Sequence, residues 1–474
     1  QPQQQLMPDH DMTPRPTSAQ ITRPGIRLGR WLAAACAMGA SLTPLHAALA
    51  AECAPAAPAA PVKGAKGAGA TAGAAAQHSS APSSDNISEL TFAGLQKATA
   101  LMSQKKTDEA IEKLKELTAR GTDYDKAFIY YNLGAIYAGK NDYGNATEYF
   151  TKSLSYNALP KETADQTQYM LGQIYIANNQ YDQGIAALLT YFDTTCNVIT
   201  PDQRMFVASA MAERKRYTEA LEQTNLALAQ AKEPKESWIQ FKLGIQYEMK
   251  DFQACTDTLI QLIAMAPGKP DYWKQLSGVL LQLNDEGKAT AVLALADRQG
   301  MLDKPEDIQN LYSTYMMLGE PLKAAQLIDT SIASNKMPSN EATLELVSNA
   351  WINARESEKA EDTLKKLASM SDRGEYYFRL GAMYGDQERW NDSKGMLEHA
   401  LEKGGLKRPG EAYFRIAVAD YRSEDIKGAM AMLQKASTYD ETKQQASEWM
   451  RVLQPQQASG APAATTPAPA SGKS

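Results

Sequence analysis

Along most of the chain, apolar residues recur at spacings of three, four and seven, the period of a helix that buries one face. One such stretch carries Phe128, Tyr131, Leu133, Ile136 and Tyr137. After the polar turn Lys140-Asn141-Asp142, a second stretch carries Tyr143, Ala146, Tyr149, Phe150 and Leu154. The alternating pattern that predicts strands does not occur between residues 85 and 454. The chain is therefore predicted to be all-α and built from paired amphipathic helices.

The helix pairs recur as a repeat. An apolar residue followed by a small one precedes an aromatic by three positions, and a second small residue comes nine positions later. This second small residue falls at positions 110, 146, 184, 220, 255, 289, 324, 360, 393 and 429, at steps of 33 to 38 residues. A single pair cannot bury its apolar face, whereas stacked pairs can. We therefore predict a solenoid of about ten helix pairs over residues 87–453.

The repeat resembles the tetratricopeptide repeat, whose pattern is W-x2-L-G-x2-Y followed by A-x3-F. Tyr130, Leu133-Gly134 and Tyr137, followed by Ala146 and Phe150, match nearly all of that pattern. The resemblance implies a tetratricopeptide-type solenoid of helical hairpins wound as a right-handed superhelix. It also implies that the first helix of each pair lines a concave groove that binds proteins or peptides. A helical solenoid of another type is the alternative.

The resemblance places one or two residues of each first helix in this groove. The candidate protein-binding residues are Tyr131, Tyr169, Gln173, Met205, Phe241, Lys274, Gln309, Glu345, Phe378 and Phe414. Aromatic rings at these positions either anchor a peptide or pack against the neighbouring helix. Some members of the family hold peptide C-termini with a Lys/Asn/Arg clamp. That clamp is not expected here, because the corresponding positions hold Tyr131, Ala135, Met170 and Asp202.

The segment before the repeats has the pattern of a targeting sequence. Basic residues between 23 and 30 precede the uncharged apolar stretch 31–45, and small-x-small sites end at Ala47 and Ala50. This order is typical of a secretory signal peptide. We therefore predict that residues 1–50 are a signal peptide with an upstream extension, and that the protein is periplasmic.

The regions that flank the repeats are predicted to be disordered. The linker 51–86 and the tail 454–474 are rich in Ala, Pro, Gly and Ser, and they contain few large apolar residues. Glu52 precedes Cys53, and no Leu lies three positions before that cysteine, so lipidation is not expected. After the signal segment, no stretch is long and apolar enough to predict a membrane span.

The charge distribution narrows the class of partner. The chain has 49 Lys and Arg against 55 Asp and Glu, a formal net charge of −6. Six of the basic and three of the acidic residues precede residue 85, and Lys473 lies in the tail, so residues 85–454 carry a net charge of −10. This acidic character argues against nucleic-acid binding, which needs a basic surface.

The repeats contain few residues suited to catalysis. After the signal segment the chain has two histidines, His78 in the linker and His399 alone on a predicted helix. Cys255 takes the position of a small core residue, and Cys196 lies in a predicted loop, where it could be a free thiol. No phosphate-binding loop, dinucleotide motif, zinc motif or nucleophile elbow is present. We therefore predict no enzyme, no metal site and no cofactor.

Several segments of the second half resemble a narrower group, the periplasmic tetratricopeptide proteins encoded beside TonB, ExbB and ExbD in Gram-negative bacteria. The segments are Pro267–Leu276, Leu344–Trp351, Tyr377–Tyr384 with Trp390, and Glu402–Leu406. The resemblance implies an accessory scaffold of TonB-dependent outer-membrane transport, with TonB, ExbB, ExbD or an outer-membrane receptor as partner. A factor in envelope or cell-wall assembly, or in outer-membrane protein biogenesis, is the alternative.

Overall fold

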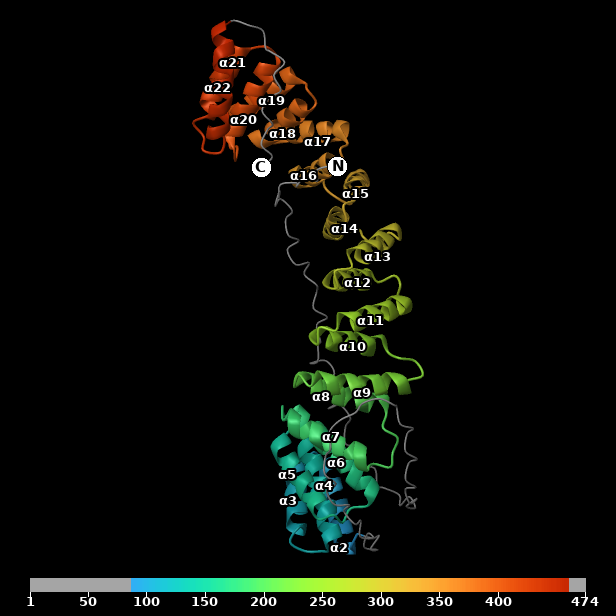
Figure 1. Cartoon of the computed structure of the whole chain (residues 1–474). Helices are drawn as coiled ribbons and strands as arrows, with labels where there is room; N and C mark the ends of the chain where they lie inside the picture. Colours follow the sequence, from blue (N-terminus) through green and yellow to red (C-terminus); the bar gives the residue numbers. More distant parts are fainter. Residues whose placement is uncertain (1–86, 460–474) are drawn as a thin grey trace, which may run out of the picture. The chain divides into compact units, whose positions relative to one another are not determined.

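Residues 87–459, which the computed structural model describes, form the helices α2 to α22 and contain no strand (Figure 1). They divide into an N-terminal unit, residues 87–258, and a C-terminal unit, residues 259–459. The predicted all-α class is confirmed. The predicted signal peptide and linker lie outside the described residues, and the right-handed superhelix stays a prediction.

The helices follow one another in ten consecutive pairs and one final helix. The first five pairs are α2 (Glu89–Ser103) with α3 (Thr107–Leu117), α4 (Asp123–Gly139) with α5 (Tyr143–Ser155), α6 (Lys161–Ala177) with α7 (Tyr181–Thr194), α8 (Pro201–Glu213) with α9 (Tyr217–Gln230), and α10 (Glu236–Glu248) with α11 (Phe252–Met265). The next five are α12 (Pro270–Gln282) with α13 (Glu286–Arg298), α14 (Pro305–Met317) with α15 (Pro321–Ala333), α16 (Glu341–Asn353) with α17 (Ser357–Met370), α18 (Gly374–Asp386) with α19 (Trp390–Lys403), and α20 (Pro409–Arg422) with α21 (Ile426–Ala436). The last helix is α22 (Lys443–Ser459). The described residues thus contain ten pairs, where the sequence pattern predicts about ten.

Each pair is joined by the same kind of turn. One residue in each turn has a left-handed backbone with φ between 57° and 72°, and these residues are Lys105, Asn141, Asn179, Lys215, Lys250, Asn284, Gly319, Arg355, Glu388 and Glu424. Asn and Gly adopt this conformation at low cost, which explains four of the ten positions. These turn residues recur at the same steps of 33 to 38 residues as the small residues of the sequence pattern.

The two helices of a pair approach closely where the sequence provides small residues. On α4, a Cβ added to Gly134 would lie 2.7 Å from the Phe150 ring of α5. Ala146, also on α5, is completely buried. The expectation that small residues mark the helix crossing is therefore confirmed in this pair. In both units, the helices pack mainly on their neighbours in sequence (Figure 1).

The end of the C-terminal unit differs from the prediction. Disorder was expected from residue 454, but α22 continues to Ser459. Ala446, Trp449 and Leu453 are buried at helical spacing, and they cover the apolar face of α20 and α21. The Trp449 ring packs in a T-shaped arrangement against Phe414 and Tyr421, at centroid distances of 5.6 and 5.7 Å. A terminal helix of this kind shields the last repeat from water.

The start of α4 stabilises the N-terminal unit through a buried carboxylate. The backbone N–H groups of Ser88 and Thr122 donate to Asp125 at 2.9 Å each, and the Thr122 hydroxyl donates at 2.8 Å. Burial alone would raise the pKa of Asp125, but these hydrogen bonds outweigh it and lower the pKa to about 2.

Replacing Asp125 by asparagine is expected to lower the free energy of unfolding of this region by about 2 kcal/mol at neutral pH. Because the folded-state pKa lies below the ordinary value of 3.8, the stabilisation is complete above that pH and is lost as the pH falls towards 2. Hydrogen exchange of α2 and α4 across this pH range measures the effect. The control Asp123→Asn alters an exposed carboxylate in the same turn and is expected to change little. Equal effects of the two variants would contradict the assigned role of Asp125.

The described cysteines are in two different states. Cys196, in the loop between α7 and α8, is disulfide-bonded. The sequence left the state of this cysteine open, and the structure excludes the free thiol. Cys255 on α11 is free and completely buried, and burial raises the pKa of its thiol to about 12. Its role as a small core residue is as predicted from the sequence.

Candidate functional site

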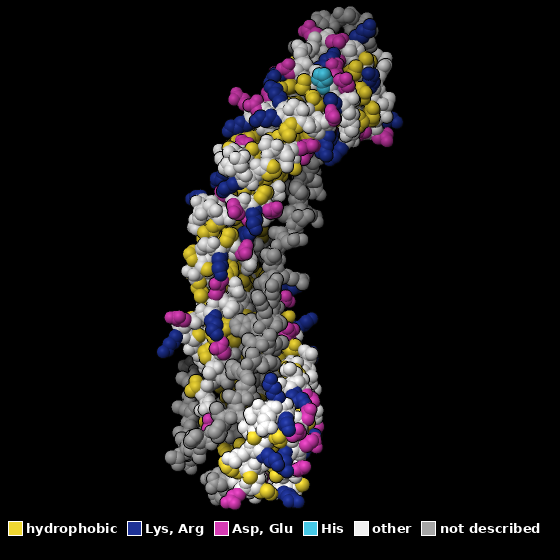
Figure 2. All heavy atoms as spheres, turned by 180° about the vertical axis from the view of Figure 1, so that it is seen from behind, with side chains coloured by type: hydrophobic (Ala, Val, Ile, Leu, Met, Phe, Trp, Pro, Cys, Tyr) yellow, Lys and Arg dark blue, Asp and Glu magenta, His cyan; other side chains and the backbone are white. Residues whose placement is uncertain are grey.

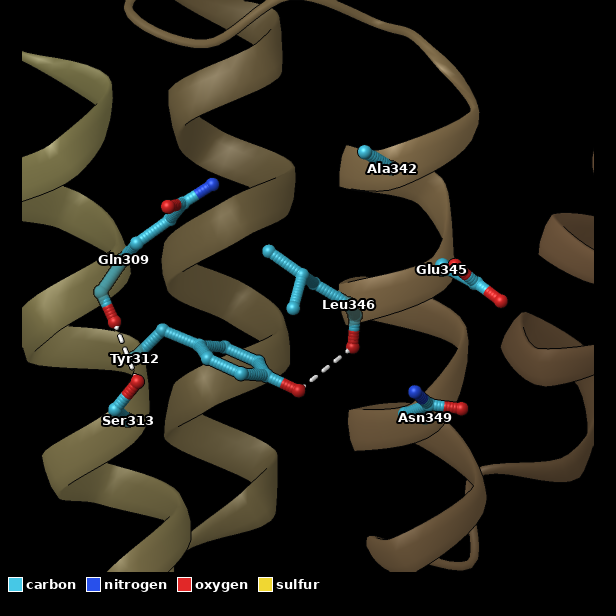
Figure 3. Close-up of a pocket in the computed structure, with 7 residues that line it drawn as sticks. All are labelled: Gln309, Tyr312, Ser313, Ala342, Glu345, Leu346 and Asn349. Atoms are coloured by element: carbon cyan, nitrogen blue, oxygen red, sulfur yellow. Dashed lines mark hydrogen bonds between the residues drawn. The ribbon is translucent and has the colours of Figure 1, made fainter. Parts of the chain in front are cut away.

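A hollow of about 430 Å³ opens between the first helices of two successive pairs in the C-terminal unit. Its wall on α14 consists of Gln309, Tyr312 and Ser313 (Figure 3). Its wall on α16 consists of Ala342, Glu345, Leu346 and Asn349 (Figure 3). Two of the candidate residues predicted from the sequence, Gln309 and Glu345, thus lie in one site.

The two walls are regular helix faces. On both helices the lining residues are three or four positions apart, so they share one face. Residues next to them in the sequence point into the protein: Ile308 and Leu311 on α14, and Leu344 and Val347 on α16, are all buried. Pro305 at the start of α14 and the Asn340 side chain that caps α16 fix where each helix begins. The alternation of buried and lining positions therefore presents the polar side chains on one surface.

A hydrogen bond between the two helices forms the floor of the hollow. The Tyr312 hydroxyl on α14 donates to the backbone carbonyl of Leu346 on α16 at 3.0 Å (Figure 3). Burial raises the pKa of Tyr312 to about 12, so its hydroxyl stays protonated and remains a donor at neutral pH. Trp351, two residues after Asn349, is 2% exposed and belongs to the same core as Tyr312. The floor is therefore fixed by packing and by a direct bond.

Some polar side chains above this floor already have hydrogen-bond partners within the protein, and others have none among the described residues. The Ser313 hydroxyl donates to the Gln309 carbonyl at 2.9 Å. On α18, the Arg379 guanidinium donates to the side-chain amide oxygen of Asn349 at 2.5 Å and to the Ser348 hydroxyl at 3.3 Å. No described residue hydrogen-bonds to the side-chain amide of Gln309 or to the carboxylate of Glu345. The site thus combines the Asn349 amide, which Arg379 orients, with the amide of Gln309 and the carboxylate of Glu345.

The two cations beside the hollow, Arg379 and Lys274, differ in their partners. Burial lowers the pKa of Arg379, and the nearby Glu345 and Glu375 carboxylates partly oppose this effect. On α12, Lys274 forms ion pairs with Asp271 at 3.1 Å and with the buried Asp307 at 3.2 Å. Lys274 was also predicted to face a groove, but its ammonium is held by these two carboxylates.

Most of the other candidate residues take part in packing between helices. Tyr131 contacts Phe150, with 6.0 Å between ring centroids, and Tyr169 contacts Tyr191 at 5.1 Å. Phe241 packs against two buried clusters of the N-terminal unit, and Phe378 packs against Leu397 and its neighbours in the C-terminal unit. Gln173 is half-buried on α6. These residues are spread over several pairs and form no single site, and their role in binding stays a prediction.

Two candidate residues have no accessible side chain to offer a ligand. Met205 is 6% exposed and packs with Ala227 and Trp238. Phe414 is 7% exposed and is covered by Trp449 of α22. The structure therefore does not place them in an open groove, because later helices bury both side chains: α9 and α10 cover Met205, and α22 covers Phe414.

The described residues contain no cluster of three or more His, Cys, Asp or Glu that could hold a metal ion. His399 is exposed on α19, with Glu402 3.4 Å away. None of the helices in residues 87–459 has the length and apolar character that a membrane span requires. Figure 2 shows positive and negative side chains intermixed on the face that it displays, without the broad basic area typical of nucleic-acid binding.

Comparisons with known proteins agree with the repeat pattern. The tetratricopeptide repeat family model matches residues 129–158 and 165–192, which fall within α4 to α7. No curated protein matches the chain significantly.

Several solved structures show low overall similarity. YrrB, described as a tetratricopeptide protein with an unusual peptide-binding site, is 12% identical with a TM-score of 0.33, and the match covers 41% of this chain and 97% of YrrB. The Cut9–Hcn1 assembly of the APC/C is 12% identical over 78% of both chains, with a TM-score of 0.27. The TPR2AB domain of yeast Sti1 in complex with an Hsp90 peptide is 14% identical over 54% of this chain and 98% of that domain, also with a TM-score of 0.27. With TM-scores this low, these similarities support no functional conclusion.

The fold is an array of helical hairpins of the tetratricopeptide type, and the sequence contains tetratricopeptide repeats. Arrays of this class are protein–protein interaction scaffolds, and each repeat presents side chains of its first helix on a shared surface. The hollow between α14 and α16 is such a surface.

Proposed function

We propose that the chain is a periplasmic interaction scaffold that assists a TonB-dependent outer-membrane transport system. The observation that carries the binding role is the hollow on α14 and α16. There the Gln309 amide and the Glu345 carboxylate, which have no hydrogen-bond partner among the described residues, lie above the floor that the Tyr312–Leu346 hydrogen bond fixes. The predicted signal peptide supports the periplasmic location, and the resemblance to periplasmic tetratricopeptide proteins supports the link to TonB.

Two segments that carry this resemblance have structural roles in the C-terminal unit. In the first, the Trp273 indole N–H donates to the Pro267 carbonyl at 2.9 Å, which fixes the loop before α12. In the second, Gly404 and Gly405 both have a φ of 71°, which side chains rarely tolerate, so the turn after α19 requires glycine. Both motifs thus have a structural role in this chain, and the partner has to be identified by experiment.

The test is a cross-linking purification of the full chain from the bacterium that encodes it, grown under iron or carbon limitation. Enrichment of TonB, ExbB, ExbD or an outer-membrane receptor over an unrelated periplasmic bait is the expected result. Cell fractionation of the same culture should place the protein in the periplasm. Recovery of peptidoglycan enzymes or of outer-membrane assembly factors instead would favour the alternative role in envelope assembly.

A further inference from the structure

We propose that the hollow between α14 and α16 binds an extended polypeptide segment through its backbone and selects a Lys or Arg side chain of that segment at Glu345. The inference rests on the proposed role in protein binding and adds the chemistry of the partner. It depends on the hydrogen-bonding capacity, the charge and the rigidity of the seven lining residues.

The amides of the hollow are suited to a peptide backbone. Arg379 can only donate, so its bond at 2.5 Å identifies the Asn349 oxygen as the acceptor and leaves the Asn349 NH2 group available. The Gln309 side chain offers an oxygen and an NH2 group, and it is exposed. An extended peptide presents carbonyl and N–H groups in alternation, so it can bond to both amides while it lies across α14 and α16.

The charge of the site favours a basic side chain. Glu345 is half-buried, and its carboxylate forms no ion pair within residues 87–459. It projects from α16 on the side away from α14, beyond the two amides (Figure 3). A cation placed there would gain a charge-assisted hydrogen bond in a partly desolvated position, whereas a carboxylate would be repelled.

The neighbouring helices extend this preference. Glu306 on α14 and Glu375 on α18 also form no ion pair among the described side chains. The adjoining first helices contribute less positive charge than these carboxylates contribute negative charge. Lys274 is outnumbered by the two aspartates that hold it. Arg379, whose hydrogen-bond acceptors Ser348 and Asn349 are neutral, is a single cation near both Glu345 and Glu375. The uncompensated charge around the hollow is therefore negative, which complements a Lys or Arg of the partner.

The site is formed before the partner arrives. The Tyr312–Leu346 hydrogen bond and the Trp351 core hold α14 and α16 in place, so little ordering is required of the protein on binding. Leu346 and Ala342 are the aliphatic lining residues, which is a small apolar area for an amphipathic helix to bury. An extended segment with small residues around one basic side chain fits the hollow better than a helix.

The experiment uses the full chain and fluorescein-labelled nonapeptides of Ala, Ser and Gly with Lys, Arg, Gln or Glu at the central position. Fluorescence anisotropy at low ionic strength is expected to show about tenfold tighter binding of the Lys and Arg peptides than of the Gln peptide, with the Glu peptide weakest. Glu345→Gln should remove the difference between the Lys and Gln peptides. Gln309→Ala should weaken all four peptides to a similar degree, because it removes a backbone contact.

Glu358→Gln is the matched control, because it removes the same charge from an exposed site on α17 that does not line the hollow. This variant should retain the preference for Lys and Arg. The inference is overturned if no peptide binds, if the unaltered protein binds Lys and Gln peptides equally, or if the control loses the preference as Glu345→Gln does. If Glu345→Gln still recovers components of the TonB system in the cross-linking purification, the inference fails and the proposed function stands.

Discussion

Replacing Gly374 by alanine is expected to destabilise the C-terminal unit by about 3 kcal/mol, because the new methyl group would overlap two backbone carbonyls. A Cβ at this position would lie 2.3 Å from the Ala400 oxygen and 2.6 Å from the Gly404 oxygen. Both oxygens belong to the last turn of α19 and the turn after it, where a φ of 71° already constrains the chain. A rotamer change cannot relieve a contact with backbone, so α18 and α19 would have to separate.

Gly395→Ala provides the matched comparison. Gly395 lies within α19, and a Cβ added there meets no atom within 4 Å. Since alanine favours helix over glycine, this substitution should be neutral or should stabilise the helix by up to about 1 kcal/mol. Hydrogen exchange of α18 and α19, together with the urea midpoint of the full chain, measures both variants. Similar stability of the two would show that the helices tolerate a wider separation than their geometry indicates.

Replacing Trp351 by alanine is expected to cost about 4 kcal/mol, the largest effect that we predict. The side chain is 2% exposed and belongs to the core that includes Tyr312 and Leu364, and the Lys359 ammonium lies 4.2 Å from its ring centroid. Truncation would remove this contact and leave a cavity between α16 and α17 that rigid helix backbones cannot fill.

The adjacent Ile352 is 42% exposed and serves as the control, because Ile352→Ala removes apolar surface that is already partly in water. That variant should lose less than about 1 kcal/mol. Urea unfolding should be followed by far-UV circular dichroism, since the substitution removes a fluorophore. If Ile352→Ala proved as damaging as Trp351→Ala, the core would lie elsewhere on α16.

The array could be predicted from the sequence because its two requirements are local. Helical spacing shows which face is buried, and a small residue such as Gly134 or Ala146 must occupy each crossing point. The same reasoning missed α22, because a final helix without a partner does not continue the period. Its buried residues Ala446, Trp449 and Leu453 do have helical spacing, and that was the available signal.

The candidate site could be predicted only in part. Gln309 and Glu345 were expected to face a partner, and Ser313 and Asn349 follow them by four residues on the same faces. The contribution of Arg379 from the next pair depends on how neighbouring pairs tilt, which spacing along one helix does not specify. For the same reason, the sequence could not distinguish an aromatic ring in a groove from one that packs against another helix, as Phe414 does against α22.

Packing between sequence neighbours, which prevails in both units, has a consequence for how the chain folds. Contacts between residues that are close in sequence require little loop closure, so each hairpin can form early and serve as a template for the next. Partial unfolding can likewise remain confined to a few helices. A chain that is delivered progressively from its N-terminus could therefore assemble pair by pair, without waiting for its last helix.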